Sequence, residues 1–264
     1  MKIGIIGIGV VGSACKKGFE SVGHNVLIHD IKLGTSVEDL MSAEIIYICV
    51  PSPSNKDGSC NTQIVESVVN EIEVLNFQGV TVIKSTVEIG TTARLAKKYN
   101  NNKICFVPEF LRERCAEEDF INHGALLIGS ENKIVQKAVI DSHGNLPSKV
   151  VNMNPTEAEM SKYFHNVFNA MRVVFANEIY EICQHELIDY DRVLNGCLER
   201  NDYSDKYLRV DESLRGYAGV CLPKDTKALA AYCKKNDLPL NIFKDIDKSN
   251  ERLKKTVFKN MRKN

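Results

Sequence analysis

The chain has 264 residues, enough for one large domain or two modest ones, and 44% of them are apolar, as in ordinary globular proteins. Lys and Arg together number 34, as do Asp and Glu, so no net charge draws the protein to nucleic acid or to an anionic membrane. No segment approaches the roughly 18 apolar residues of a membrane-spanning helix, and the short apolar run at 3–8, which glycines interrupt, is not a signal peptide.

Nine cysteines are scattered singly along the chain. Their odd number and the lack of any Cys-x-x-Cys pair argue against a disulfide scaffold or a zinc ribbon. We therefore expect a reducing compartment, the cytoplasm, in which one cysteine can be reactive and the others are buried fillers. None of the six histidines has neighbours at metal-ligand spacing, so we expect no metal.

From residue 1 to 153, short β-rich runs alternate with helical stretches. Several runs are apolar throughout, which is typical of parallel strands covered on both faces. The expected strands are 2–6, 25–29, 45–50, 81–84, 104–106, 125–128 and 149–152. The pattern predicts an α/β fold in which residues 1–153 form a Rossmann-type doubly wound sheet.

Residues 154–264 have only helical patterns, which predicts an all-helical domain with a long central helix. Asn154 is a typical N-cap, Pro155 suits the first helical position, and neither Gly nor Pro follows before about His185. The expected helix of about 30 residues exceeds one small core, so we predict a homodimer through it. Further helices are expected at 191–200, 226–235 and 241–262.

The segment Gly7-Ile8-Gly9-Val10-Val11-Gly12 directly follows the first strand and opens a helix. Glycines there permit a sharp turn and a close approach to a pyrophosphate, and the helix N-terminus supplies amide donors. Asp30 stands 18 residues after Gly12 at the end of the second strand. Its carboxylate can accept both ribose hydroxyls and would repel a 2′-phosphate, so NAD is favoured over NADP. The candidates for cofactor binding in this part are Gly7, Gly9, Val10, Val11, Gly12 and Asp30.

Five further stretches are not explained by dinucleotide binding alone. They are Val-Pro-Ser-Pro-Ser at 50–54, Lys-Ser-Thr-Val at 84–87, Pro-Glu-Phe-Leu-Arg-Glu at 108–113, Glu-Met-Ser-Lys-Tyr at 159–163 with Asn166, and Cys-Leu-Pro-Lys-Asp-Thr at 221–226. In this order they resemble the UDP-glucose/GDP-mannose dehydrogenase family, whose members oxidise the C6 alcohol of a nucleotide sugar to an acid with two NAD⁺. The likeness runs to about residue 235. Because the sequence ends at Asn264, before the family's second nucleotide-binding domain, we expect a short form that lacks it.

The chemistry of such a four-electron oxidation needs an aldehyde held in place for a second hydride transfer. A thiolate can hold it as a thiohemiacetal, which is then oxidised to a thioester and hydrolysed. We predict that Cys221 is this nucleophile and that the charge of Lys224 favours its thiolate. Lys162 and Asn166 lie one helical turn apart, so the amine can remove or stabilise the alcohol proton while the amide orients the oxygen.

The resemblance implies the remaining roles. Asp225 resembles a carboxylate that orders the catalytic water or partners the lysine, and Glu109 resembles the acid or base of thioester hydrolysis. Thr86 resembles the residue that positions this water, and Glu113 is placed like the carboxylate at the nicotinamide ribose. A purely structural alternative for Glu109 and Glu113 is that they form the acidic first turn of a helix, where the helix dipole stabilises negative charge. The other cofactor-binding candidates are Val50, Pro51, Ser52, Ser85 and Thr86. The substrate-binding candidates are Phe110, Leu111, Lys162, Asn166, Gly216, Tyr217, Gly219 and Lys224.

Three functions are compatible with these features. The first is an NAD-dependent, UDP-glucose 6-dehydrogenase-like enzyme that oxidises a nucleotide sugar, an activity that serves polysaccharide biosynthesis. The second is a two-electron β-hydroxyacid-type dehydrogenase, which also joins a Rossmann domain to a long helix with Lys and, four residues on, Asn, but has no use for Cys221. The third is a non-catalytic remnant that binds NAD or a nucleotide sugar.

Overall fold

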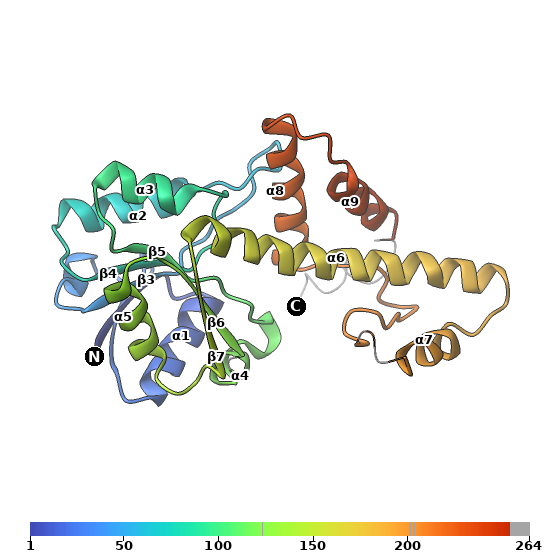
Figure 1. The fold of residues 1–264 in the computed structure, drawn as a ribbon, viewed down its shortest axis with the longest axis horizontal. Helices are drawn as coiled ribbons and strands as arrows, with labels where there is room; N and C mark the ends of the chain where they lie inside the picture. The colour runs from blue at the N-terminus through green and yellow to red at the C-terminus, as the bar shows by residue number, and fades with distance from the viewer. Residues whose placement is uncertain (123, 201, 203, 254–264) are drawn as a thin grey trace. The chain divides into compact units, whose positions relative to one another are not determined.

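The computed structural model describes residues 1–122, 124–200, 202 and 204–253 (Figure 1). The chain divides into two compact units. Unit 1 comprises residues 1–53 and 60–162, and unit 2 comprises residues 54–59 and 163–264. The predicted domain boundary at 153/154 lies directly before the long helix α6 (Pro155–His185), whereas the two units part at residue 162, within that helix.

Unit 1 is built on a seven-stranded sheet with the strand order β2-β1-β3-β4-β5-β6-β7. Neighbouring strands are parallel except for β5 and β6, which are antiparallel. This parallel-dominated sheet confirms the predicted α/β fold class, and the direction of β6 is a departure from an all-parallel sheet. An apolar strand that is covered on both faces reads the same in either direction, so the sequence carries no signal for this reversal. The strands are β1 (Lys2–Ile6), β2 (Asn25–His29), β3 (Ile45–Ile48), β4 (Val80–Ile83), β5 (Ile104–Phe106), β6 (Ala125–Gly129) and β7 (Lys149–Met153).

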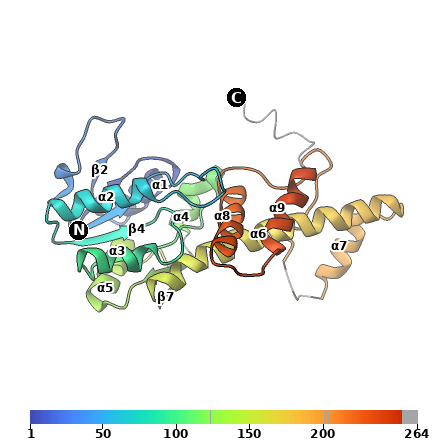
Figure 2. The ribbon, with the colours of Figure 1, turned by 90° about the horizontal axis from the view of Figure 1, so that it is seen from above.

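Helices cover both faces of the sheet, which explains why central strands such as β3 are apolar throughout (Figures 1 and 2). One core lies between the sheet and α1, α4 and α5, and includes the rings of Phe19, Tyr47 and Phe120. The other lies against α2 and α3, and includes Val69 and Leu95. The helices are α1 (Val10–Ser21), α2 (Gln63–Val74), α3 (Thr91–Tyr99), α4 (Ala116–Ile121) and α5 (Lys133–His143), with short 3₁₀ turns at Glu38–Leu40 and Glu113–Cys115.

Unit 2 is helical in its described residues: α6 continues into it and is followed by α7 (Tyr190–Leu198), α8 (Cys221–Lys235) and α9 (Ile242–Leu253). The predicted start of α8 at Thr226 is wrong, because the helix already begins at Cys221. Pro223 stands in its first turn, where the N–H that proline lacks has no intrahelical partner in any case. Residues 254–262 of the predicted last helix lie outside the described chain.

Helix α6 has 31 residues, in agreement with the prediction of about 30. A reciprocal capping box starts it. The backbone N–H of Glu157 donates to Asn154 Oδ1 at 2.9 Å, and the N–H of Asn154 donates to the Glu157 carboxylate at 2.8 Å. No helix within the described ranges combines the length and the apolar character needed to cross a membrane.

Candidate active site

The turn from β1 into α1 depends on two glycines. Gly7 has a φ of +90°, and a Cβ there would lie 2.9 Å from the backbone carbonyl of Cys49. A Cβ on Gly12 would lie 1.9 Å from the carbonyl oxygen of Gly7, so any larger residue would push α1 away from the strand. The loop therefore crosses the sheet where the strand order turns back between β1 and β3, the place at which open α/β sheets bind nucleotides.

The N-terminus of α1 is open to a ligand. Gly9 is the N-cap residue of α1, and it has no side chain that could accept a hydrogen bond from the first amides of the helix. The backbone N–H groups at Val10 and Val11 therefore have no capping side chain as an acceptor. A Cβ added to Gly9 would meet no protein atom within 4 Å. This open space in front of backbone donors at a helix N-terminus fits the pyrophosphate of NAD.

Asp30 lies beside this loop at the end of β2. Its carboxylate accepts the N–H of Ile8 at 2.8 Å and the N–H of Lys32 at 2.9 Å. These two bonds, that of Lys32 first, hold the pKa of Asp30 below its usual value. The group is therefore an anion at neutral pH and is fixed next to the glycine loop, as an acceptor of ribose hydroxyls must be.

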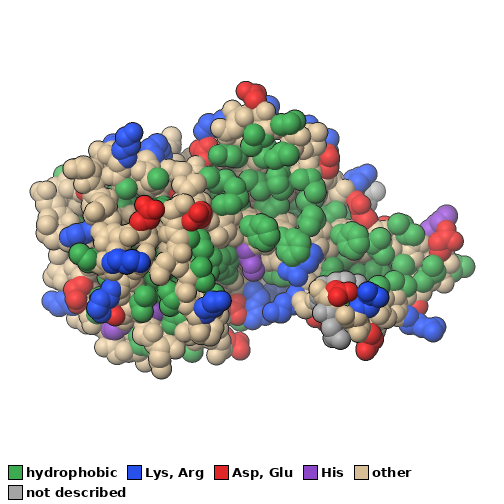
Figure 3. Space-filling view, in the orientation of Figure 1, with side chains coloured by type: hydrophobic (Ala, Val, Ile, Leu, Met, Phe, Trp, Pro, Cys, Tyr) green, Lys and Arg blue, Asp and Glu red, His purple; other side chains and the backbone are tan. Residues whose placement is uncertain are grey.

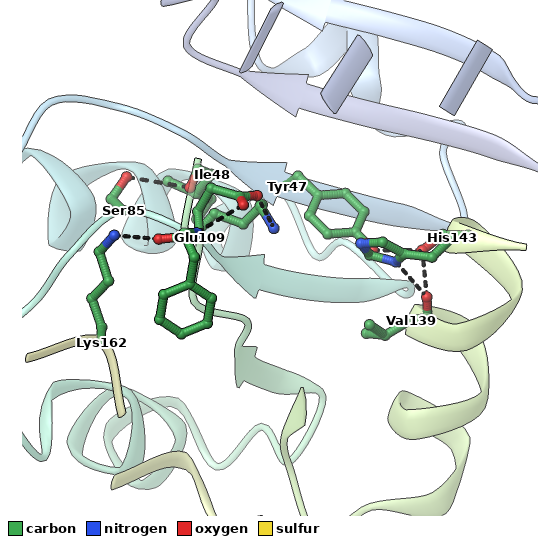
Figure 4. Close-up of polar contacts among 10 residues, drawn as sticks. Tyr47, Ile48, Ser85, Glu109, Val139, His143 and Lys162 are labelled. Carbon is green, nitrogen blue, oxygen red and sulfur yellow. Dashed lines mark hydrogen bonds and ion pairs between the residues drawn. The ribbon is translucent and has the colours of Figure 1, made fainter. Parts of the chain in front are cut away.

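The predicted residues after β3 and β4 lie at the same edge of the sheet, because both strands are parallel to β1. Val50, Pro51 and Ser52 follow β3, and Ser85 and Thr86 follow β4. The hydroxyl of Ser85 donates to the carbonyl oxygen of Val50 at 2.7 Å and joins the two strand ends, with a second contact to Ile48 at 3.3 Å that Figure 4 draws.

Glu109 follows β5 and is buried, with 4% of its surface exposed. One carboxylate oxygen accepts the N–H of Phe110 at 2.9 Å, and the other lies 2.9 Å from the amine of Lys84. Lys162 donates to the backbone oxygen of Glu109 (Figure 4). Its amine lies 5.5 Å from the centre of the Phe110 ring. Unit 1 thus brings together three predicted residues: Glu109, Phe110 and Lys162.

Lys84 belongs to the Lys-Ser-Thr-Val motif but was not among the predicted site residues. Its side chain is fully buried at the end of β4. One sequence feature could have identified it: Lys84 directly follows the strand-like run 80–83. A lysine at the end of a buried strand needs a charged or polar partner, because lysine is almost never buried without one. The sequence could not name that partner, which comes from a different strand end.

Glu113 and Leu111 lie further along the same loop. Glu113 begins a 3₁₀ turn and is exposed, whereas Leu111 is half-buried against the core of unit 1. An ion pair of 2.6 Å between Arg112, directly before the turn, and Asp119 of α4 spans the turn. Glu113 thus begins a short exposed turn, and no contact among the described residues of unit 1 joins it to Glu109.

In unit 2, Asp225 is completely buried and is held from two sides. The amide of Asn166 donates to one carboxylate oxygen at 2.5 Å, and the amine of Lys224 lies 3.0 Å from the other. Cys221 precedes Asp225 by four residues, so the two lie on one face of α8. Lys162 precedes Asn166 by the same spacing on α6. The Asn166–Asp225 bond therefore links the helix that carries the predicted lysine to the helix that carries the predicted thiol.

Cys221 is exposed and is the first residue of α8, where the helix dipole favours negative charge. The preceding segment, which includes Gly216 and Gly219, is fixed by two buried asparagines that the sequence analysis missed. Asn250 of α9 bonds both the N–H and the carbonyl of Tyr217, at 2.7 and 3.0 Å. Asn177 of α6 accepts from the guanidinium of Arg215 at 2.6 Å. Asparagine gives no sequence pattern for such long-range bonds.

Tyr217 has a different place from the one predicted. Its side chain is 3% exposed and packs with Ala170, Val174 and Ile246 in the core of unit 2. Burial of the ring also raises the pKa of its hydroxyl. We therefore assign Tyr217 to packing and no longer to substrate binding.

Both parts of the chain match models of one protein family. Residues 32–147 match the family model for the NAD-binding domain of the UDP-glucose/GDP-mannose dehydrogenase family, and residues 156–252 match the model for its central domain. The chain belongs to this family. The match to the NAD-binding domain model confirms the expected cofactor, NAD, which fits the glycine loop and Asp30 described above.

Relatives in the UDP-glucose/GDP-mannose dehydrogenase family are longer than this chain. UDP-glucose 6-dehydrogenase from Bacillus subtilis is 30% identical over 95% of this chain, which spans 63% of that relative. The solved structure of a UDP-glucose dehydrogenase from Pyrobaculum islandicum is 26% identical in sequence and superimposes with a TM-score of 0.85. The match covers 95% of this chain and 68% of the chain in that structure. A Mycobacterium tuberculosis 3-hydroxyisobutyrate dehydrogenase, 10% identical with a TM-score of 0.76 over 95% of this chain and 92% of its own, shares the fold alone.

Proposed function

We propose that this member of the family is an NAD-dependent dehydrogenase that oxidises the C6 primary alcohol of a nucleotide sugar, UDP-glucose or a similar compound, to the uronic acid. The observation that carries the proposal is the buried Asn166–Asp225 hydrogen bond of 2.5 Å. It links α6, with Lys162, to α8, which begins with the exposed Cys221. A base or proton donor, an orienting amide and a nucleophile are the groups that a four-electron alcohol oxidation needs.

The first oxidation takes the alcohol to the aldehyde. Lys162 removes or stabilises the proton of the alcohol, and Asn166, whose amide is held by Asp225, orients the oxygen. When bound at the glycine loop and Asp30, NAD⁺ supplies the hydride acceptor for both oxidations. Lys162 lies beside the Phe110 ring, which limits access of water to the amine.

The second oxidation needs the aldehyde to be held. The sulfur of Cys221 adds to the aldehyde carbon to form a thiohemiacetal, and oxidation of this adduct forms a thioester. By the family resemblance, Thr86 and Asp225 have the role of ordering a water molecule, and Glu109 has the role of accepting its proton as the water attacks. Cys221 is free to react because its side chain is exposed at the start of a helix.

The reaction is tested by counting NADH and identifying the product by mass spectrometry with UDP-glucose, GDP-mannose and UDP-N-acetylated sugars. The wild-type protein is expected to release two NADH per acid formed. Cys221→Ser is expected to abolish acid while an aldehyde-level or stalled covalent product accumulates. Cys197→Ser, on α7, is the matched control and should keep the wild-type yield. Unchanged acid formation by Cys221→Ser would refute the covalent route.

A two-electron β-hydroxyacid-type dehydrogenase is the second candidate, because the fold is shared with the 3-hydroxyisobutyrate dehydrogenase named above. It would release one NADH per substrate and would be indifferent to Cys221→Ser. A non-catalytic remnant would bind NAD and reduce none of it with any nucleotide sugar. The same NADH count therefore separates the three functions.

We also propose that the protein acts as a homodimer in the cytoplasm. Hydrophobic side chains are exposed along α6 at Phe164, Phe168, Phe175 and Ile182, and Figure 3 shows such side chains gathered on this helix. The last three are seven residues apart and Phe164 lies one turn earlier, which is the spacing of a helix-pairing seam. The nine cysteines all lie in the described ranges and none is joined in a disulfide, in keeping with a reducing compartment.

A further inference from the structure

The ion pair between Lys84 and Glu109 is unusual in its surroundings. The Lys84 side chain is fully buried and that of Glu109 is 5% exposed. The Lys84 amine lies 5.9 Å from the ring centres of both Tyr47 and Phe120, so aromatic surfaces rather than water surround the charge. Replacing a buried ion pair by well-packed apolar residues is often neutral or stabilising, so stability alone does not explain this pair.

We propose that Lys84 is a positioning residue for the hydrolysis step, whose ammonium group keeps the Glu109 carboxylate ionised and fixed so that it can accept a proton from the attacking water. This inference rests on the proposed function. In the step, the water oxygen bonds to the thioester carbon, the carbon–sulfur bond breaks, and the sulfur of Cys221 leaves as a thiolate. The proton of the water passes to Glu109. Lys84 itself contacts neither substrate nor water.

The geometry gives Lys84 this influence over Glu109. A carboxylate in a dry interior is disfavoured unless a cation and hydrogen bonds compensate it. Lys84 supplies the cation at 2.9 Å, and the N–H of Phe110 supplies a hydrogen bond of the same length. The carboxylate is thus held between two strand ends, those of β4 and β5, and each fixes one of its oxygens.

The other titratable groups around the pair support the assignment. They come from four elements and are Cys15, Tyr47, Cys49, Cys105 and Lys162. Burial raises the pKa values of Cys15, Tyr47 and Cys105, so these three remain neutral near pH 7. Burial is the largest single influence on the pKa of Lys84 and acts to lower it, but Glu109, Cys15 and Cys49 together raise the net pKa. The amine of Lys84 therefore stays protonated near pH 7.

The test compares Lys84→Met with Lys84→Arg, which restores the charge, in the full chain. In Lys84→Met the acidic limb of the pH profile of acid formation should move up by about one to three pH units. At pH 7 acid formation should therefore fall by about tenfold or more, while NAD binding and the first hydride transfer persist. Lys84→Arg should return the limb toward the wild-type position. Lys84→Gln is the second neutral variant if the methionine protein does not fold.

Val82→Ala is the matched control, because Val82 is fully buried in β4, the strand that Lys84 directly follows, and its side chain carries no charge. It should lower the melting temperature without moving the pH profile. A merely structural role for Lys84 predicts the same behaviour for Lys84→Met. A Lys84→Met profile that keeps the wild-type acidic limb would overturn the inference and leave the proposed function intact.

A readout that needs no turnover separates the two proposals. In protein with ¹³C-labelled glutamate side chains, the Glu109 signal is assigned by its loss in Glu109→Gln. Its titration midpoint should lie at higher pH in Lys84→Met than in the wild type. If the wild type makes no acid from any nucleotide sugar, the proposed function fails, and an identical midpoint in both proteins refutes the role of Lys84 by itself.

Discussion

At the scale of single residues, backbone hydrogen bonds fix the Asp30 carboxylate in place and keep it charged. Two backbone N–H groups, from Lys32 and from Ile8 of the glycine loop, hold its carboxylate. They favour the charged form and lower its pKa. The stability that these bonds contribute is present above the ordinary pKa of 3.8 and is lost as the pH falls through the lowered value.

Asp30→Asn is expected to weaken NAD binding by about 10- to 100-fold, because charge-assisted hydrogen bonds contribute roughly 1.5–3 kcal/mol each. Wild-type affinity should stay constant from pH 8 down to pH 5 and fall only in stronger acid. Isothermal titration calorimetry across this pH range measures both effects. Asp211→Asn is the control, since Asp211 is an exposed carboxylate bonded to the N–H of Ser213 in unit 2, and it should leave the affinity unchanged.

At the scale of elements, helix α3 begins with a cap that comes from another helix. Its N-cap residue is Gly90, which has no side chain to satisfy the first amides. Glu159 of α6 accepts the N–H of Gly90 at 2.5 Å and that of Thr92 at 2.8 Å. The carboxylate is buried, so it replaces water at this helix end and ties the first turns of α6 to unit 1.

Glu159→Ala should therefore destabilise the protein by about 2–4 kcal/mol, because it leaves two amides at a buried helix end without acceptors. Urea unfolding followed by circular dichroism measures the change. Glu157→Ala removes the exposed capping box two residues earlier and should cost only about 0.5–2 kcal/mol. Equal losses in the two variants would contradict the capping role of Glu159.

At the scale of the whole molecule, the exposed seam along α6 is the feature that a second copy of the chain would cover. Phe164 is 70% exposed and Phe175 is 61% exposed, and such large apolar side chains in a row favour association. A double substitution, Phe164→Ser with Phe175→Ser, should shift the protein to monomer in sedimentation velocity. Ile134→Ser, at a side chain that is 69% exposed on α5, should leave the dimer in place. A wild-type monomer at micromolar concentration would rule out the dimer.

Much of this architecture could be predicted from the sequence because it depends on local patterns. The strands β1, β2 and β5 have the predicted bounds, since each contains a short apolar run that a covered sheet requires. The glycine loop could be recognised because Gly7 and Gly12 meet local constraints of backbone conformation and close approach at a fixed spacing. The length of α6 followed from a cap and the absence of helix breakers.

Only the tertiary structure decided which groups meet. The direction of β6, the partner of Lys84, the two asparagines that fix the segment before Cys221 and the burial of Tyr217 all depend on residues far apart in the sequence. A side chain carries no local record of a partner that lies 25 or more positions away, as Glu109 does from Lys84. Composition and periodicity therefore specified the layers of unit 1 and the long helix, whereas three-dimensional packing alone selected the pairs that build the candidate site.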